Sequence, residues 1–427
     1  MTGRILAAAL AAAVCAAAHG AVTFTATCDS KDGVYRCGET ATVTVTTSEG
    51  GAPAKEGRFK VIVDDFGPNK LSESEVDLSA GNPFKVTMTM KKPGFARVRT
   101  SADQKWCWGV AFEPEKIVKG SPSPADFDSF WANGRAKLAK DVPMDLRLDR
   151  VEERSSHRFD FYRISAATFG RRVHGYLAVP ADRAKGPFPA DVNVAAAGFG
   201  NWTNDAHGDP GRVKLFFSVY PFEPDWKWQE KGLKEKLYDA MNNGYKEKCG
   251  TTYPSSGLAE SREASFYYPV ILGIDRVLDW LARQDYVDAT RIAYQGTSQG
   301  GGMGLALCAL NKHISRAALY VPAMTDTMGY LAGRVSGWPR PYESHPAAVR
   351  AEVEKNAPYF DGANFASRIT IPVRVAVGFS DTTCPPCAVY AAYNALASKD
   401  KEIRHGLGMT HSCRQEFYKE LGAWLTR

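Results

Sequence analysis

The sequence predicts an α/β protein in which a doubly wound, mainly parallel sheet follows a small all-β, immunoglobulin-like sandwich domain. In the later part of the chain, apolar strands are expected at 191–197, 291–295, 317–321 and 371–378, separated by loops and helical stretches. Before residue 115, apolar and polar residues alternate with the two-residue period of half-buried strands. A length of 427 residues with 44% hydrophobic residues suits two or three domains with real cores.

The first domain is expected over residues 21–118. The segments 41–46 and 84–90 alternate as strands, and glycine and proline turn signals recur between them. Trp106 and Trp108 near its end fit either stacking on sugar rings or packing at a domain junction, and packing is favoured. A linker is expected over residues 119–124, Lys-Gly-Ser-Pro-Ser-Pro.

The catalytic domain is expected over residues 119–427. The stretch 268–283 has the apolar stripe of a helix that covers a sheet. Two insertions are expected, near 201–265 and 325–350. The first has too few periodic residues for regular strands throughout and is interpreted as part of a lid or rim.

The stretch 291–307 carries the most specific motif of the chain. A short strand runs into Gly-Thr-Ser-Gln-Gly at 296–300, and a helix of small residues follows. A G-x-S-x-G set between a strand and a helix is the nucleophile elbow of α/β-hydrolases, so Ser298 is the candidate nucleophile. A Cβ at Gly296 or Gly300 would collide with the strand or helix packed beside the turn. A glycine-rich turn without chemistry is the alternative, and the two flanks favour the elbow.

A serine hydroxyl is a weak nucleophile, so an acid and a base should follow in the order Ser, Asp, His. Asp381 lies just beyond the strand 371–378, at the end where such sheets place catalytic groups. Asp326, which follows the strand 317–321, is a rival for the acid.

His411 is the candidate base among the eight histidines of the chain. It ends the loop 406–411, between an expected last strand at 402–405 and the terminal helix. His405 is near in sequence but falls inside that strand, so we interpret it as structural.

Four segments resemble the acetyl xylan esterase and cephalosporin-C deacetylase family, carbohydrate esterase family seven. They are 125–131, 279–292, the Ser-Gln-Gly-Gly elbow at 298–301, and 381–394 with its Asp-Thr-Thr-Cys-Pro-Pro acid loop. The likeness runs over most of the last 300 residues. It implies that Ser298, Asp381 and His411 are nucleophile, acid and base, and that the backbone N–H of Gln299 is an oxyanion-hole donor.

The resemblance also implies a second oxyanion donor, the N–H of Phe199. Gly-Phe-Gly at 198–200 fills the place where the family usually has His-Gly-Tyr-Gly. The family's Arg-Gly-Gln-Gly after the next strand is also absent, since 215–220 runs into Pro-Phe-Glu-Pro-Asp-Trp. These departures affect the substrate contacts that the family would imply.

Residues 1–20 are typical of a secretory signal peptide, with one charge at Arg4, an apolar run, and Ala18-His19-Gly20 as the cleavage site. A secreted or periplasmic protein is therefore expected. The run from Ile5 to Ala18 is too short to cross a bilayer, and no other segment comes close.

Eight cysteines would remain after cleavage, an even number that suggests disulfides without fixing their pairing. Cys28 and Cys37 are the favoured local pair, and Cys384 could bridge to Cys413. Cys384-Pro-Pro-Cys387 resembles a redox motif, but it lies in the acid loop and does not open a thioredoxin-like unit.

The charge balance of 53 basic and 47 acidic residues is nearly even, and no basic run is interleaved with aromatics, so a nucleic-acid partner is not expected. No metal-ligand spacing occurs, and neither a metal nor another cofactor is predicted. An oligomer is left open.

These observations predict an exported serine esterase that removes acetyl or other small acyl groups from carbohydrate such as xylan or its oligosaccharides. A broad carboxylesterase and a prolyl-oligopeptidase-type serine peptidase remain as alternatives. An inactive carbohydrate-binding protein is a third, against which the complete set of three candidate residues argues.

Overall fold

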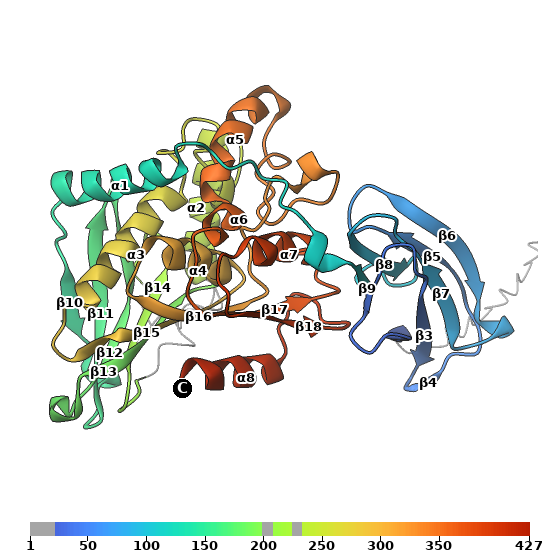
Figure 1. Ribbon diagram of the computed structural model, residues 1–427, viewed down its shortest axis with the longest axis horizontal. Coiled ribbons are helices and arrows are strands. Elements are labelled where there is room, and N and C mark those ends of the chain that lie inside the picture. Colours follow the sequence, from blue (N-terminus) through green and yellow to red (C-terminus); the bar gives the residue numbers. More distant parts are fainter. Residues whose placement is uncertain (1–21, 199–207, 224–232) are drawn as a thin grey trace, which may run out of the picture.

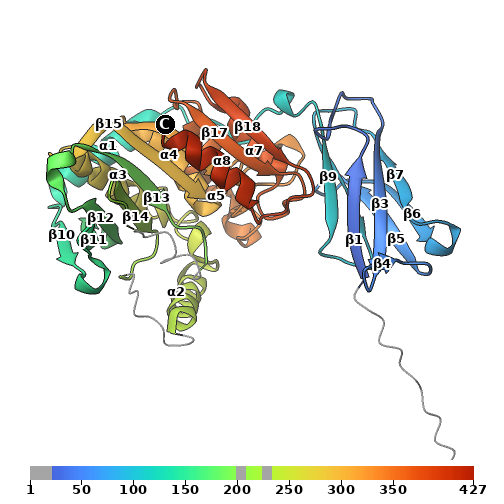
Figure 2. The same ribbon diagram turned by 90° about the horizontal axis from the view of Figure 1, so that it is seen from below.

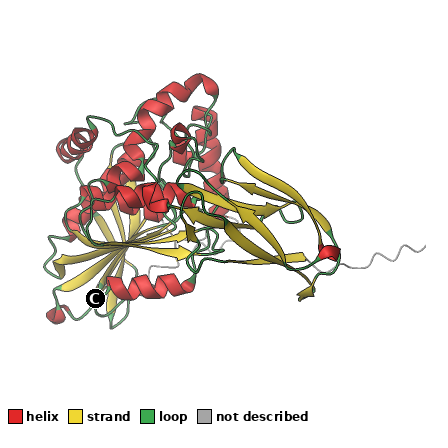
Figure 3. Ribbon diagram, turned by 45° about the vertical axis from the view of Figure 1, so that its right-hand side comes forward, coloured by secondary structure: helices red, strands yellow, loops and turns green. Residues whose placement is uncertain are grey.

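The computed structural model describes residues 22–198, 208–223 and 233–427, which form two units joined by a short connection (Figure 1). In Figure 3 the first unit consists almost wholly of strands, whereas helices cover the sheet of the second. The strands of the first unit are β1 Val22–Cys28, β2 Val34–Tyr35, β3 Ala41–Glu49, β4 Ala52–Pro53, β5 Arg58–Asp64, β6 Lys70–Asp77, β7 Phe84–Met88, β8 Gly94–Thr100 and β9 Cys107–Phe112.

The first unit has two sheets around a hydrophobic core of its own. One sheet has the order β1-β3-β4 with β7 also paired to β3, and the other has the order β2-β9-β8-β5-β6. Strand β3 shows why they pack: its burial alternates with the two-residue period, and Val43 and Val45 lie in the core. The immunoglobulin-like topology stays a prediction.

The second unit is an α/β structure. Its elements are α1 Phe127–Asp141, β10 Arg147–Arg150, β11 Phe159–Thr168, β12 Arg171–Pro180, β13 Phe188–Val194, β14 Val213–Ser218, α2 Leu233–Cys249, α3 Tyr267–Leu281, β15 Val287–Thr297, α4 Gln299–Leu310, β16 Ile314–Tyr320, α5 Arg350–Asn356, α6 Gly362–Ala366, β17 Val373–Gly378, α7 Pro386–Ala395, β18 Lys401–Gly406 and α8 Gln415–Leu425.

Its described strands form one sheet in the order β10-β11-β12-β14-β13-β15-β16-β17-β18. The pairs from β10 to β14 are antiparallel, and every pair from β14 to β18 is parallel. Helices α1, α3 and α4 lie on one face of this sheet and α8 on the other (Figure 1). The predicted doubly wound, mainly parallel sheet is confirmed.

The insertion expected near 201–265 contains more regular structure than the sequence indicated. It includes β14, which is the strand expected at 215–220, and α2, which was not predicted. Helix α2 contains only a few apolar residues among lysines, asparagines and tyrosines, so its helical period is weak in the sequence.

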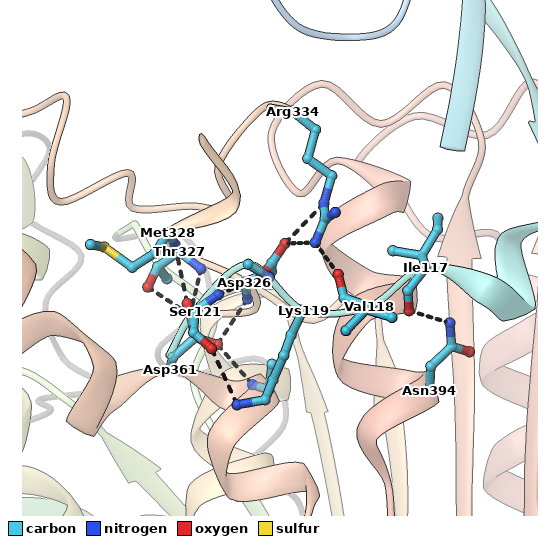
Figure 4. A network of polar contacts seen from close by, with 12 residues as sticks. Ile117, Val118, Lys119, Ser121, Asp326, Thr327, Met328, Arg334, Asp361 and Asn394 are labelled. Carbon is cyan, nitrogen blue, oxygen red and sulfur yellow. Dashed lines mark hydrogen bonds and ion pairs between the residues drawn. The ribbon is translucent and has the colours of Figure 1, made fainter. Parts of the chain in front are cut away.

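The connection at 119–124 is held against the second unit by hydrogen bonds (Figure 4). The backbone N–H groups of Gly120 and Ser121 donate to Asp326 Oδ1 over 2.6 and 3.2 Å. The Ser121 hydroxyl donates to buried Asp361, and Arg334 forms an ion pair of 2.6 Å with Asp326. These contacts with two buried carboxylates hold residues 120 and 121 against the second unit, so the predicted linker has a fixed path there.

The eight cysteines of the described residues are free thiols, so the structure pairs neither Cys28 with Cys37 nor Cys384 with Cys413. The Cys28 thiol instead donates to the Ser30 carbonyl oxygen over 3.1 Å. No helix among the described residues is both long and apolar enough to cross a membrane.

Candidate active site

Ser298 stands at the turn between β15 and α4, at the carboxyl edge of the parallel sheet. Its backbone has φ 56° and ψ −119°, a left-handed conformation that non-glycine residues adopt rarely and at a cost in energy. The turn is crowded: a Cβ on Gly296 would lie 2.4 Å from the Gly300 carbonyl oxygen, and one on Gly300 would lie 2.1 Å from the Val194 carbonyl oxygen. The glycines therefore let the strand and the helix meet closely on either side of Ser298.

Three side chains predicted from the sequence form one hydrogen-bonded chain. His411 Nε2 lies 2.9 Å from Ser298 Oγ, and His411 Nδ1 lies 2.8 Å from Asp381 Oδ2. Asp381 is fully buried, whereas 31% of the His411 side chain is exposed. The arrangement can move a proton from the serine to the imidazole while the carboxylate holds the ring orientation.

Backbone N–H groups of the loop after β17 hold the second carboxylate oxygen of Asp381. Its second oxygen, Oδ1, accepts hydrogen bonds from the backbone N–H groups of Thr383 and Cys384 over 2.8 and 2.9 Å. Both carboxylate oxygens are therefore engaged, which leaves the side chain one orientation. The carboxylate faces His411 because β17 and β18 run parallel and deliver both loops to the same edge.

Cys384 completes a cluster in which ligand atoms of Asp381, Cys384 and His411 lie within 4.8 Å of one another. Such a cluster has the donor types of a metal site. However, burial raises the pKa of Cys384 well above its usual value, and His411 and Asp381 already bond to each other. Burial likewise raises the pKa of Cys387 to about 12, which disfavours the thiolate form that a redox motif needs.

The rivals considered from the sequence lie elsewhere. Asp326 binds the connection between the units and Arg334, and its partners do not include His411. His405 lies on β18, where its Nε2 is 2.5 Å from the Tyr390 hydroxyl, and burial lowers its pKa.

Gln299 is the first residue of α4, where backbone N–H groups have no partner within the helix and can donate to a ligand. Its side chain is fully buried. The Tyr253 and Tyr267 hydroxyls donate to its Oε1 over 2.8 and 2.9 Å, and its Nε2 donates to the Ala195 carbonyl oxygen over 3.2 Å. The last of these bonds connects the elbow to Ala195, the residue that directly follows β13.

The loop after β13 is held by a third tyrosine. The Gly198 N–H donates to the Tyr220 hydroxyl over 2.9 Å, and that hydroxyl lies 3.4 Å from the Tyr253 hydroxyl. Phe199, expected to supply the second oxyanion donor, lies outside the described residues. The sequence analysis missed the tyrosines, since no local motif marks them and each comes from a different segment.

Two sequence comparisons relate the chain to known esterases. Residues 115–427 match the family described as acetyl xylan esterase (AXE1). The acetyl esterase Axe7A of Xylanibacter ruminicola is 27% identical over 384 residues, which cover 87% of this chain and 83% of that protein.

Solved structures show the same fold. The acetyl xylan esterase from Paenibacillus sp. R4 is 24% identical with a TM-score of 0.58, over 74% of this chain and 98% of that chain. Acetyl xylan esterase 1 from Thermoanaerobacterium sp. JW/SL YS485 is 21% identical with a TM-score of 0.59, over 73% and 96% of the two chains.

Proposed function

Since the chain belongs to the acetyl xylan esterase family and is a carboxylic-ester hydrolase, we propose that it removes acetyl groups from acetylated xylan or its oligosaccharides with Ser298 as nucleophile. The observation that carries the proposal is the hydrogen-bonded chain from Ser298 through His411 to Asp381. Its first member, Ser298, lies on a strained turn between β15 and α4.

In the proposed first step, His411 Nε2 takes the proton of Ser298 Oγ while Oγ attacks the ester carbonyl carbon. The resulting imidazolium is stabilised by Asp381. The negative charge that develops on the carbonyl oxygen is held by the Gln299 N–H and by the N–H proposed for Phe199. When the carbon–oxygen bond to the sugar breaks, His411 returns the proton to the leaving sugar oxygen.

In the proposed second step, a water molecule gives a proton to His411 Nε2 and attacks the acetyl carbonyl carbon of the acyl-enzyme. The tetrahedral species collapses, His411 returns the proton to Ser298 Oγ, and acetic acid leaves and loses its proton to the solvent. Each group thus serves twice, which is why one hydrogen-bonded chain suffices for both halves of the reaction.

Ser298→Ala tests the proposal. It should lower acetate release from acetylated xylo-oligosaccharides by on the order of 10⁴-fold or more without changing the melting temperature. An organophosphonate should label the wild-type protein at Ser298 and nowhere else. Labelling at another serine, or full activity of the variant, would contradict the assignment.

A substrate panel separates the alternatives. Acetylated oligosaccharides, aryl acetates and peptide anilides should be compared with the same enzyme preparation. Preference for the acetylated sugars supports a carbohydrate esterase, equal rates on the aryl and sugar esters indicate a broad carboxylesterase, and cleavage of the anilides indicates a peptidase.

We also propose that the protein is exported, because the first 20 residues have the pattern of a signal peptide. Expression of the full chain in a Gram-negative host should yield a periplasmic or extracellular product that begins near Ala21. A cytoplasmic product that still begins at Met1 would contradict export.

A further inference from the structure

Strand β9 of the first unit lies directly against the residues that precede Asp381. The Gly109 N–H donates to Ser380 Oγ over 3.3 Å, and the Cys107 thiol donates to the Ser380 carbonyl oxygen over 3.5 Å. A Cβ on Gly109 would lie 1.9 Å from the Phe379 carbonyl oxygen. Only a glycine permits this approach, so the backbone of β9 supports the start of the acid loop.

An aromatic contact reinforces that support. Phe95 on β8 is 1% exposed and belongs to the hydrophobic core of the catalytic unit. Its ring meets the Phe379 ring edge-on with centroids 5.1 Å apart and lies 5.6 Å from the Tyr390 ring on α7. Figures 1 and 2 both show β9 on the side of the first unit that faces α7 and β18, and Figure 1 shows β8 beside it.

The same strand reaches the loop that carries His411. The Trp108 ring lies over Gly408: a Cβ on that glycine would be 2.3 Å from a ring carbon of Trp108. Likewise, a Cβ on Gly33 would be 2.4 Å from Leu407 Cδ2. Trp108 therefore packs against this loop, residues 406–411, which we call the base loop.

The two loops also bond to each other. The Phe379 N–H donates to the Gly406 carbonyl oxygen, and the Ser380 N–H donates to the Met409 carbonyl oxygen, both over 3.0 Å. Because the acid loop and the base loop are coupled in this way, a displacement of either should change the distance between Asp381 and His411.

We infer that the first unit is a positioning element of the active site. Trp108 packs against the loop that carries His411, and Gly109 packs against the loop that carries Asp381. These contacts hold the two side chains at hydrogen-bonding distance from each other. This inference rests on the proposed roles of those two residues. The family match begins at residue 115, so Trp108 and Gly109 lie in a part of the chain that the match does not include. Hydrogen bonds also fix the connection at 119–124 to the second unit.

The test compares Trp108→Ala and Gly109→Ala with Trp106→Ala in the full-length protein. Trp106 is a matched control because its ring packs within the first unit, with centroids 5.3 Å from Phe24. Each variant is assayed on an aryl acetate, a substrate too small to need contacts with the first unit. Its rate of inactivation by an organophosphonate and its melting temperature are also measured.

A misplacement of about 1 Å can cost on the order of 10²-fold in rate, so Trp108→Ala and Gly109→Ala should lower kcat by roughly 10- to 100-fold with KM within about twofold. Phosphonylation of Ser298 should slow in parallel. Trp106→Ala should leave both rates within about twofold, and Trp108→Phe, which keeps a ring over Gly408, should restore most of the activity.

The inference is overturned if folded Trp108→Ala has the wild-type kcat, if Trp106→Ala loses as much, or if KM alone rises. If Gly109→Ala does not fold, the comparison of Trp108→Ala with Trp108→Phe and Trp106→Ala still decides. Failure of the proposed function is a separate result, because then the wild type would be inactive on the aryl acetate or Ser298→Ala would retain activity.

Discussion

The Tyr253 hydroxyl donates a hydrogen bond of 2.8 Å to the side-chain oxygen of Gln299, the residue next to the candidate nucleophile. Tyr267 donates to the same oxygen. Burial raises the pKa of both tyrosines well above the usual value, so both hydroxyls stay protonated and act as donors. The Gln299 side chain thus has a fixed place, and it anchors the backbone N–H that is proposed to donate to the oxyanion.

Gln299→Ala keeps the backbone N–H but removes the side chain that anchors it, so kcat on aryl acetates should fall by up to about 10²-fold with little change in KM, because a misplacement of about 1 Å can have an effect of that size. The side chain acts through the position of its own backbone. Tyr253→Phe and Tyr267→Phe should each have a smaller effect than the double variant, because in each single variant the remaining tyrosine hydroxyl still bonds to Gln299 Oε1. Steady-state kinetics of this series measures the coupling. An unchanged kcat in folded Gln299→Ala would contradict the role.

Asp381→Asn should lower kcat by about 10⁴-fold with little change in substrate affinity, because the amide favours the wrong imidazole tautomer. Asp326→Asn is the matched control. It leaves Arg334 without its charge partner, so the free energy of unfolding should fall by about 3 kcal/mol while kcat is unchanged. Urea unfolding and kinetics on both variants measure this. The reverse pattern would assign the acid to Asp326.

Ser121→Ala should lower the free energy of unfolding by about 1–3 kcal/mol, since it removes a donor to buried Asp361 and an acceptor for the Met328 N–H. Ser123→Ala is the control, because Ser123 is exposed and its loss should cost about 0.5 kcal/mol. Chemical denaturation separates the two. Equal losses would mean that the connection is not fixed at Ser121.

The stability of the fold should decrease in mild acid because of His174 on β12. Burial lowers the pKa of this residue to about 4, whereas an exposed histidine has a pKa of about 6.5. Between these values the unfolded chain binds more protons than the folded one, so the free energy of unfolding falls as the pH falls. From pH 7 to pH 5 the loss due to His174 should be about 2 kcal/mol.

His174→Gln removes this titration. Urea unfolding at pH 7 and pH 5 should therefore show a smaller acid-induced loss in the variant than in the wild type. If both proteins lose the same free energy, His174 is not the group responsible.

The elbow around Ser298 could be predicted from the sequence because its chemistry is local. The strand, the glycines and the small-residue helix follow one another within 17 residues, and each has a recognisable pattern. Asp381 and His411 were found because parallel strands deliver their loops to one edge of a sheet. For these residues, order along the chain determines position in space.

The contacts of the first unit with the catalytic loops carry no such pattern. Gly109 and Ser380 are 271 positions apart, and nothing in either segment encodes the other. The same holds for the tyrosines around Gln299, which come from separate segments. The even number of cysteines suggested disulfides, but an even count fixes no distances, and the thiols remain free.

The separation between Gly109 and Ser380 also determines the order in which the protein can be assembled. Ribosomes add about 5–20 residues per second, so these 271 positions correspond to roughly 14–54 s of synthesis. During that interval the strands of the first unit can pair, yet Phe95 and Trp108 have no loop to cover them. Until the later part of the chain arrives, this apolar surface is exposed to water, and surface exposed in this way favours aggregation.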